Sequence, residues 1–322
     1  MAERDEDDTL RAEPGRSGGA AAYRAGFACL VGRPNAGKST LTNALVGQKV
    51  AITSSKPQTT RHTIRGICTS AQSQLVLVDT PGLHRPRTLL GERLNDLVRE
   101  TLLGVDVVGF CVPADQRVGP GDQFIAAELV ELQRARRVPV VAIVTKTDLV
   151  PRERLLRQLV AVDALGEWAA VVPCSATSGH QVDEVRTVLA GLLPLSPPLY
   201  PEAVRTDEPE QVMIAELVRE AALEGVRDEL PHSLAVVVEE IVPREGRPPG
   251  DAMLDVRVSL FVERSSQKAI VIGRGGARLR EVGATARAAI EQLLGSKVFL
   301  DLHVKVAKDW QRDPNALHRL GF

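Results

Sequence analysis

The sequence predicts two domains in one chain: an α/β domain with a mainly parallel sheet, followed by a smaller α+β domain. Apolar runs of strand length alternate with helical patterns from about residue 27 to residue 194. A glycine-rich turn that ends in Gly37-Lys38-Ser39 directly follows the first of these runs. A proline-rich stretch at 194–201 separates this region from a second glycine-rich loop that begins at Gly273.

The elements of the first domain follow from the length and period of each apolar segment. Short apolar runs predict strands at 27–31, 63–68, 75–79, 105–112, 138–144 and 169–174. Helical spacing predicts helices at 39–46, 90–103, 123–136, 152–165 and 182–193. Because ligands of parallel sheets bind at the carboxyl ends of the strands, polar motifs at those ends are candidates for a site.

Composition and charge limit the classes of protein to consider. The chain has 322 residues, with 44% hydrophobic and 25% charged, and no apolar run approaches 18 residues, so we expect neither a membrane-spanning helix nor a secretory signal. The net charge is only −1, but residues 257–322 hold 12 basic and 6 acidic side chains, which predicts a basic binding face there. The four cysteines lie in or beside apolar runs, which predicts buried thiols without a disulfide or zinc framework.

The first glycine-rich turn fits the phosphate-binding pattern G-x-x-x-x-G-K-S, with a strand before it and a helix after it. Because both flanks fit, we favour a phosphate loop over a chance turn. We expect Lys38 to contact the outer phosphates and the Ser39 hydroxyl to bind Mg²⁺. The predicted nucleotide-binding residues here are Gly32, Arg33, Pro34, Asn35, Ala36, Gly37, Lys38, Ser39 and Thr40.

A second motif follows the strand at 75–79, which ends in Asp79-Thr80-Pro81-Gly82. A carboxylate at this strand end suits the Mg²⁺ site, and Gly82 lets a backbone N–H approach the γ-phosphate. Between the two motifs, the polar stretch 56–62 is predicted to be a switch loop that supplies a threonine to the metal. We favour Thr60 over Thr59 for that role; the alternative is a plain surface loop.

The remaining nucleotide motif concerns the base. Asp148 in Thr145-Lys146-Thr147-Asp148 can accept from guanine N1–H and N2–H₂, while the Lys146 stem packs on the ring. Thr145 stands where asparagine is usual, and its hydroxyl can still bond the base or the phosphate loop. Ser175-Ala176 closes the last strand, where a backbone N–H can meet guanine O6. Together these motifs predict a GTP site in a P-loop GTPase domain.

The second domain is predicted to run helix–strand–strand–helix–loop–helix–strand, which is the order of a type II KH domain. The predicted elements are a helix at 211–224 capped by 206–210, strands at 234–242 and 253–262, a helix at 277–294 and a strand at 298–306. The loop has the G-x-x-G spacing that lets an RNA backbone approach closely; its alternative is a plain helix–helix turn. We favour RNA, with contacts from Gly273, Arg274, Gly275, Gly276, Arg278 and Arg280. Since aromatic residues make up only 3% of the chain, we expect base stacking to matter little.

The predicted organisation is a disordered extension (1–22), the GTPase domain (23–194), a proline-rich linker (195–210), the KH domain (211–309) and a tail (310–322). The motifs G-R-P-N-A-G-K-S, Q-T-T-R-H, D-T-P-G-L-H, T-K-T-D and I-G-R-G-G-A-R-L-R resemble the bacterial Era GTPases. This resemblance runs from about residue 26 to 322. It implies a cytoplasmic GTP-driven factor that binds small-subunit ribosomal RNA and the pre-ribosomal small subunit, with peripheral contact to the inner membrane. We expect a monomer.

Hydrolysis is expected to be slow, because Leu83 stands where many GTPases have the glutamine that orients water. The predicted catalytic residues are Lys38, Asn35 and Thr60; His84 as a base and Arg85 or Arg87 as fingers are weaker alternatives. We hypothesise that Asn35 holds K⁺ against the phosphates, as the corresponding asparagine does in potassium-dependent relatives. The alternative is that Asn35 only braces the loop.

The sequence is compatible with two functions. One is a GTP-hydrolysing switch whose nucleotide governs RNA binding, which the set Lys38, Ser39 and Asp79 favours. The other is an RNA-binding scaffold with a nearly inactive nucleotide site. A tRNA-modification GTPase is disfavoured, because those relatives lack a C-terminal KH domain.

Overall fold

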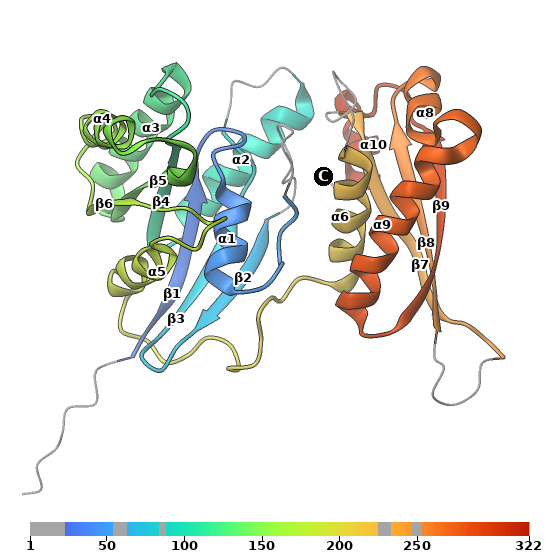
Figure 1. The fold of residues 1–322 in the computed structure, drawn as a ribbon, viewed down its shortest axis with the longest axis horizontal. Coiled ribbons are helices and arrows are strands. Elements are labelled where there is room, and N and C mark those ends of the chain that lie inside the picture. The colour runs from blue at the N-terminus through green and yellow to red at the C-terminus, as the bar shows by residue number, and fades with distance from the viewer. Residues whose placement is uncertain (1–22, 54–62, 84–87, 225–232, 247–252, 322) are drawn as a thin grey trace, which may run out of the picture.

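The computed structural model describes residues 23–53, 63–83, 88–224, 233–246 and 253–321, which form two domains (Figure 1). The predicted extension 1–22 lies outside the described residues. So do the candidate ligands Thr59 and Thr60, and the candidate catalytic residues His84, Arg85 and Arg87. Among the helices of the described parts of the chain, none is both long and apolar enough to cross a membrane.

The first domain is built on a six-stranded sheet in the order β2-β3-β1-β4-β5-β6. Only β2 runs antiparallel to its neighbour, so the predicted mainly parallel sheet is confirmed. The strands are β1 (Arg24–Val31), β2 (Ile64–Thr69), β3 (Ser73–Asp79), β4 (Val107–Pro113), β5 (Val140–Thr145) and β6 (Ala170–Pro173). The carboxyl ends of the five parallel strands therefore meet at one edge, where the nucleotide motifs lie.

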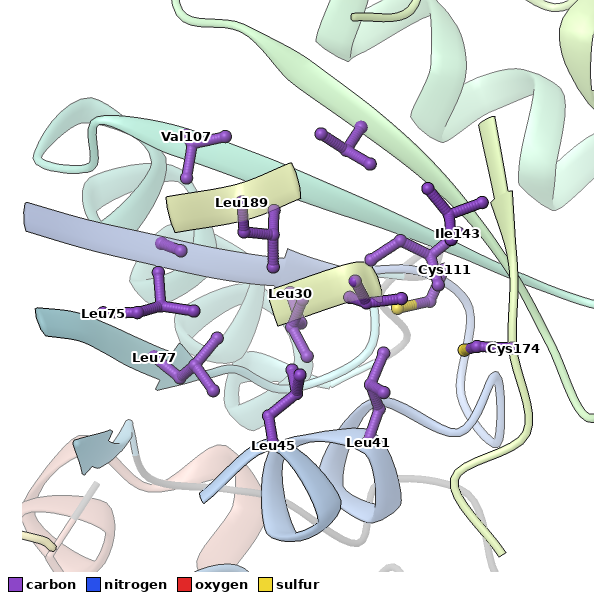
Figure 2. Packing of buried hydrophobic residues seen from close by; sticks show 14 of the residues in the cluster. Leu30, Leu41, Leu45, Leu75, Leu77, Val107, Cys111, Ile143, Cys174 and Leu189 are labelled. Atoms are coloured by element: carbon purple, nitrogen blue, oxygen red, sulfur yellow. The ribbon is translucent and has the colours of Figure 1, made fainter. Parts of the chain in front are cut away.

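Helices cover both faces of this sheet, which is why its strands read as continuous apolar runs. One face packs against α1 (Lys38–Val46) and α5 (Val182–Gly191), and the other against α2 (Leu89–Leu103), α3 (Pro120–Arg136) and α4 (Arg152–Asp163). Figure 2 shows Leu41 and Leu45 of α1 and Leu189 of α5 directed into the first of these layers.

The cysteines confirm the prediction of buried thiols. All four, Cys29, Cys68, Cys111 and Cys174, are free and buried. Burial raises the pKa of Cys29, Cys68 and Cys174 to about 12, and that of Cys111 well above its ordinary value. These thiols therefore stay protonated at neutral pH and act as small apolar side chains in the core.

The segment 195–210 between the domains is bound to the edge of the first sheet. The Gln74 side chain accepts from the N–H groups of Leu199 (2.6 Å) and Tyr200 (2.8 Å) and donates to Tyr200 O. Further along, Arg205 O accepts from the Ile67 N–H of β2 (2.8 Å). The connector is held against β2 and β3 by these contacts, and it turns at 201–204, where the Val204 N–H donates to Pro201 O (3.0 Å), so it is not extended throughout.

The second domain has the predicted type II KH order. It consists of α6 (Glu210–Leu223), β7 (Ala235–Pro243), β8 (Met253–Val262), α8 (Ser265–Ile272), α9 (Ala277–Leu294) and β9 (Lys297–Val306). β7 pairs antiparallel with β8, and β8 pairs parallel with β9. Side chains from these helices and the sheet share one apolar core, which includes Val218, Leu260 and Ile290.

The start of α6 differs from the prediction. Pro209 is the N-cap and provides no side-chain cap, although 206–210 was predicted to cap this helix. The acidic side chains of this stretch are used elsewhere: Asp207 and Glu208 both accept from Arg65 of β2. The side-chain cap is absent because the N-cap residue is Pro209, whose side chain has no hydrogen-bond acceptor.

The last residues of the chain, predicted as a tail, fold against both domains. They form a 3-10 turn (Trp310–Arg312) and the helix α10 (Pro314–Arg319). Trp310 is 0% exposed, and its indole N–H donates to Ser233 O (3.0 Å). Its apolar cluster includes Leu317 of α10 together with Leu90 and Leu94 of α2. This cluster joins the KH domain to the first domain.

Replacing Trp310 with alanine tests this packing. We expect the free energy of unfolding to fall by about 3–5 kcal/mol, because the change removes a large buried side chain. Urea unfolding followed by circular dichroism measures the loss. The control, Leu293→Ala on the partly exposed face of α9, is expected to cost under about 1 kcal/mol. Equal midpoints for Trp310→Ala and the unmodified protein contradict the packing.

Candidate functional site

The phosphate loop lies between β1 and α1, as predicted. Asn35 (φ 62°) and Gly37 (φ 88°) both adopt left-handed backbone conformations, and α1 begins immediately after Gly37. This backbone turns around the N-terminus of α1. Consecutive N–H groups and the positive end of the helix dipole together suit the binding of phosphate.

Lys38 lies inside this loop. Its Nζ donates to Gly32 O (3.3 Å) and Arg33 O (3.1 Å), and the residue is only 6% exposed. Burial lowers the pKa of Lys38 from its ordinary value, and the nearby Asp79 carboxylate opposes this by favouring the charged form. A buried ammonium at this position favours a phosphate as its further partner.

The candidate metal ligands also meet. The Ser39 hydroxyl donates to Asp79 Oδ2 (2.7 Å), and Asp79 is fully buried at the end of β3. A hydroxyl and a carboxylate are hard oxygen ligands of the type that Mg²⁺ prefers, so this pair fits the ion that accompanies a nucleotide. When bound there, Mg²⁺ neutralises charge on the phosphates.

The Asp79-Thr80-Pro81-Gly82 motif packs against the phosphate loop. A Cβ on Gly82 would lie 2.7 Å from Pro34 N, so only glycine allows this approach. The next residue, Leu83, is 3% exposed and belongs to the core beneath the sheet. Its side chain therefore faces away from solvent, and it offers no group to orient an attacking water.

The base-binding end is tied to the phosphate loop through Thr145. Its hydroxyl donates to Ala36 O (2.6 Å), one of the two partners the sequence suggested. Lys146 has φ 57° and places its Nζ 3.7 Å from the Asp115 carboxylate, a partner that the sequence did not indicate. Asp148 lies exposed in the following 3-10 turn, accessible to a base.

The last predicted base contact is at the end of β6. Ser175 is buried, and its N–H donates to His180 O (3.0 Å). Its hydroxyl accepts from the Ser178 N–H (3.1 Å). Since the Ser175 N–H is engaged within this loop, we expect Ala176 to supply the N–H that meets guanine O6.

In the KH domain, the predicted loop joins α8 to α9. Gly273 (φ 73°), Gly275 (φ 56°) and Gly276 (φ 76°) all have positive φ. A Cβ on Gly273 would lie 2.7 Å from Arg278 Cβ, whereas the same addition to Gly275 or Gly276 would meet open space. The loop is thus closed against α9 at Gly273 and open to solvent at Gly275.

The predicted RNA-binding arginines divide into three environments. Arg274 is exposed on the loop. Arg280 donates to Gly275 O (3.2 Å). Arg278 instead donates to Ala222 O (3.2 Å) and Glu224 O (2.6 Å) at the end of α6. The Arg278 guanidinium is therefore engaged inside the protein, and we now assign it to holding α6 against α9.

A groove of about 510 Å³ begins beside this loop and runs between α9 and β9. Its walls combine small residues, apolar residues and arginines. The lining residues are Gly276, Leu279, Arg280, Gly283, Ala284, Arg287, Phe299, Leu300 and Leu302. Most of these residues carry no sequence motif, and the sequence indicated them only through their helical and strand spacing.

A phosphate loop and a guanine-reading motif on a parallel sheet, followed by a KH fold, define a GTP-binding, GTP-hydrolysing protein with an appended KH domain. Residues 27–146 match the family model "50S ribosome-binding GTPase", and residues 229–311 match the KH domain model. The chain belongs to the Era family of GTPases. It is 65% identical over 305 residues to the GTPase Era of Streptomyces coelicolor, covering 93% of this chain and 95% of that protein.

Other relatives support the same family assignment. The GTPase Era of Mycobacterium tuberculosis is 64% identical over 301 residues, covering 93% of this chain and 99% of that protein. A solved structure of Era with MgGDPNP and nucleotides 1506–1542 of 16S ribosomal RNA matches with TM-score 0.87 at 35% identity, over 93% of this chain and 99% of that one. A variant of Aquifex aeolicus Era bound to GDP·AlF₄⁻ matches equally well, with TM-score 0.87 and 35% identity over 92% and 99%.

Asp148→Asn tests the assignment of the base site. We expect the preference for GTP to relax towards xanthine nucleotides, because an amide cannot accept from both N1–H and N2–H₂. The loss for GTP is about 2–4 kcal/mol, as for other unmatched polar groups. Isothermal titration with GTP, XTP and ATP measures it, with the exposed Asp163→Asn as control. Equal binding of ATP and GTP to the unmodified protein excludes the assignment.

Proposed function

We propose that this GTPase binds small-subunit ribosomal RNA through its KH domain, and that the bound nucleotide governs this binding during assembly of the small ribosomal subunit. The relative solved with MgGDPNP also holds a 16S ribosomal RNA fragment, which supports RNA as the ligand. In this chain, Gly275 and Arg274 are exposed on the loop, which supports their contact with an RNA backbone, while Leu279, Gly283 and Leu302 offer an apolar groove for bases.

The observation that carries the switch is a pair of contacts made by the α6 region. The Glu220 carboxylate of α6 accepts from the Thr53 N–H (2.9 Å) and hydroxyl (3.2 Å), and it also pairs with Lys49. Just before α6, Asp207 pairs with the Arg65 guanidinium (3.0 Å). Thr53 and Arg65 flank the segment 54–62, which contains the candidate Mg²⁺ ligand Thr60. The KH helix α6 therefore contacts the chain before this segment, and the connector that leads into α6 contacts the chain after it.

The Asp207 contact is electrostatically favourable. Burial acts to raise the pKa of Asp207, but hydrogen bonds from Tyr200 and Arg65 outweigh it and hold the pKa below its ordinary value. Asp207 is thus ionised at neutral pH and retains its attraction to Arg65. This contact is maintained across the physiological pH range.

From α6 the path continues to the RNA-binding loop. Arg278 donates to carbonyl groups at the end of α6, and its Cβ lies against Gly273 of the loop. The helix α6 thus contacts Thr53 at one point and Arg278, which supports the RNA loop, at another. We infer that GTP binding changes the contact of α6 with Lys49 and Thr53 and so shifts α6, and with it the RNA site.

The competing reading, an RNA-binding scaffold with a nearly inactive nucleotide site, predicts RNA affinity independent of the nucleotide. The set of Lys38, Ser39 and Asp79 around the phosphate loop argues against it, because these groups suit the outer phosphates and Mg²⁺ and a scaffold needs none of them. Peripheral membrane contact, a cytoplasmic location and a monomeric state follow from the resemblance and remain predictions.

The RNA assignment is tested by the double variant Arg274→Asp with Gly275→Asp. We expect RNA binding in a gel shift to be lost, since the change places negative charge where phosphate approaches. The variant is expected to fold, because a Cβ at Gly275 meets open space and aspartate tolerates its positive φ. GTP binding should be unchanged, and Arg134→Asp on the exposed surface of α3 controls for charge. Normal RNA binding by the double variant contradicts the assignment.

The proposed K⁺ site at Asn35 gives a second test. We expect faster GTP hydrolysis in KCl than in NaCl, with Asn35→Ala removing the difference, because a cation there offsets charge in the transition state. Phosphate release at matched ionic strength measures both rates. If the unmodified protein hydrolyses GTP at the same rate in KCl and in NaCl, the K⁺ site is excluded and Asn35 only braces the loop.

A further inference from the structure

An ion pair between the partly exposed Arg33 and the buried Asp122 connects the phosphate loop to α3. Arg33 Nε lies 2.7 Å from Asp122 Oδ1, and the Asp122 side chain is 0% exposed. The two residues are 89 positions apart. A fully buried carboxylate requires a cation or several donors, and Arg33 is the charged partner of Asp122.

Asp122 uses its second oxygen for α3 itself. Oδ2 accepts from the N–H of Gly119, the N-cap of this helix (2.9 Å). Asp122 occupies the third position of α3, where the helix dipole favours negative charge. The carboxylate is therefore held in one orientation by the helix, and it presents a fixed negative charge to Arg33.

The fit around Arg33 is close. A Cβ on Gly121 would lie 2.7 Å from Arg33 Cδ, so the arginine stem passes directly over the first turn of α3. The Arg33 side chain therefore points away from the phosphates towards α3. Its backbone carbonyl points the other way, accepting from Lys38 Nζ (3.1 Å) and the Ala36 N–H (3.2 Å).

We propose that Arg33 and Asp122 form a positioning pair for GTP hydrolysis. The pair fixes the position of Arg33. The Arg33 carbonyl orients the Lys38 ammonium, and Arg33 lies two positions before Asn35. On the opposite side, Pro34 is held by the close approach of Gly82. Arg33 and Pro34 of the phosphate loop are thus held between α3 and the segment 79–82. Loss of the pair lets Lys38 and Asn35 move relative to the transferred phosphate.

The variants Arg33→Met and Asp122→Asn test this role in the full-length protein with MgGTP. Asp122→Asn keeps an oxygen for the Gly119 N–H but removes the charge, which separates positioning from helix capping. We expect each variant to lower kcat by at least about tenfold while KM changes less than about threefold, since the effect is on geometry during reaction. Arg33→Lys keeps the charge and should recover most of kcat.

Two further comparisons make the result decisive. The kcat of the double variant should lie within about twofold of the kcat of either single variant, because both substitutions remove the same contact. Arg99→Met breaks the exposed Arg99–Glu128 pair between α2 and α3 and should leave kcat unchanged. The proposal is overturned if the single variants unfold at lower urea concentration but keep full kcat, or if the double variant shows the product of the two single effects.

Discussion

The burial of the Lys38 ammonium is the constraint on which the nucleotide site depends. A desolvated cation is stable only beside compensating groups, and here these are the carbonyls of Gly32 and Arg33 and the nearby Asp79 carboxylate. These partners require the loop to curl around Lys38 and require β1 and β3 to be neighbours. The site is therefore shaped before a nucleotide arrives, and a bound phosphate adds negative charge beside an existing cation.

Two different contacts join the domains, and their difference explains how the domains can respond to the nucleotide. The cluster around Trp310 is apolar and fully buried, so it holds the KH domain firmly against α2. The contact of Glu220 in α6 with Lys49 is polar and partly exposed, and such a pair contributes roughly 0–1 kcal/mol. Weak contacts of this kind are readily exchanged, while the apolar cluster keeps the domains together.

Much of the fold was predictable because parallel strands, buried on both faces, produce continuous apolar runs in the sequence. The nucleotide motifs were predictable for a related reason, since they occur at strand ends that topology brings together. Thr145 illustrates this. Its hydroxyl was predicted to bond either the base or the phosphate loop, and it donates to Ala36 O in the phosphate loop.

The contacts that the sequence did not reveal join residues far apart in the chain. Asp122 lies 89 positions from Arg33, and Glu220 lies 167 positions from Thr53. A helical glutamate such as Glu220 has the same local pattern whether it binds another domain or water. Asp122 had a weak signal, the Gly119-Pro120-Gly121 helix start, but this indicates a cap and not its arginine partner. Arg278 was predicted to contact RNA, and only the fold shows that its guanidinium donates to carbonyls at the end of α6.

The central claim is that α6 transmits the nucleotide state to the RNA site. The most direct test is the affinity for the 16S ribosomal RNA fragment 1506–1542, measured with a non-hydrolysable GTP analogue and with GDP. We expect the affinities to differ by at least about tenfold in the unmodified protein, and by less than about threefold in Glu220→Ala, with GTP affinity unchanged. Glu210→Ala, at the exposed start of α6, should behave like the unmodified protein. Equal affinities in the two nucleotide states, or an undiminished difference in Glu220→Ala, contradict the claim.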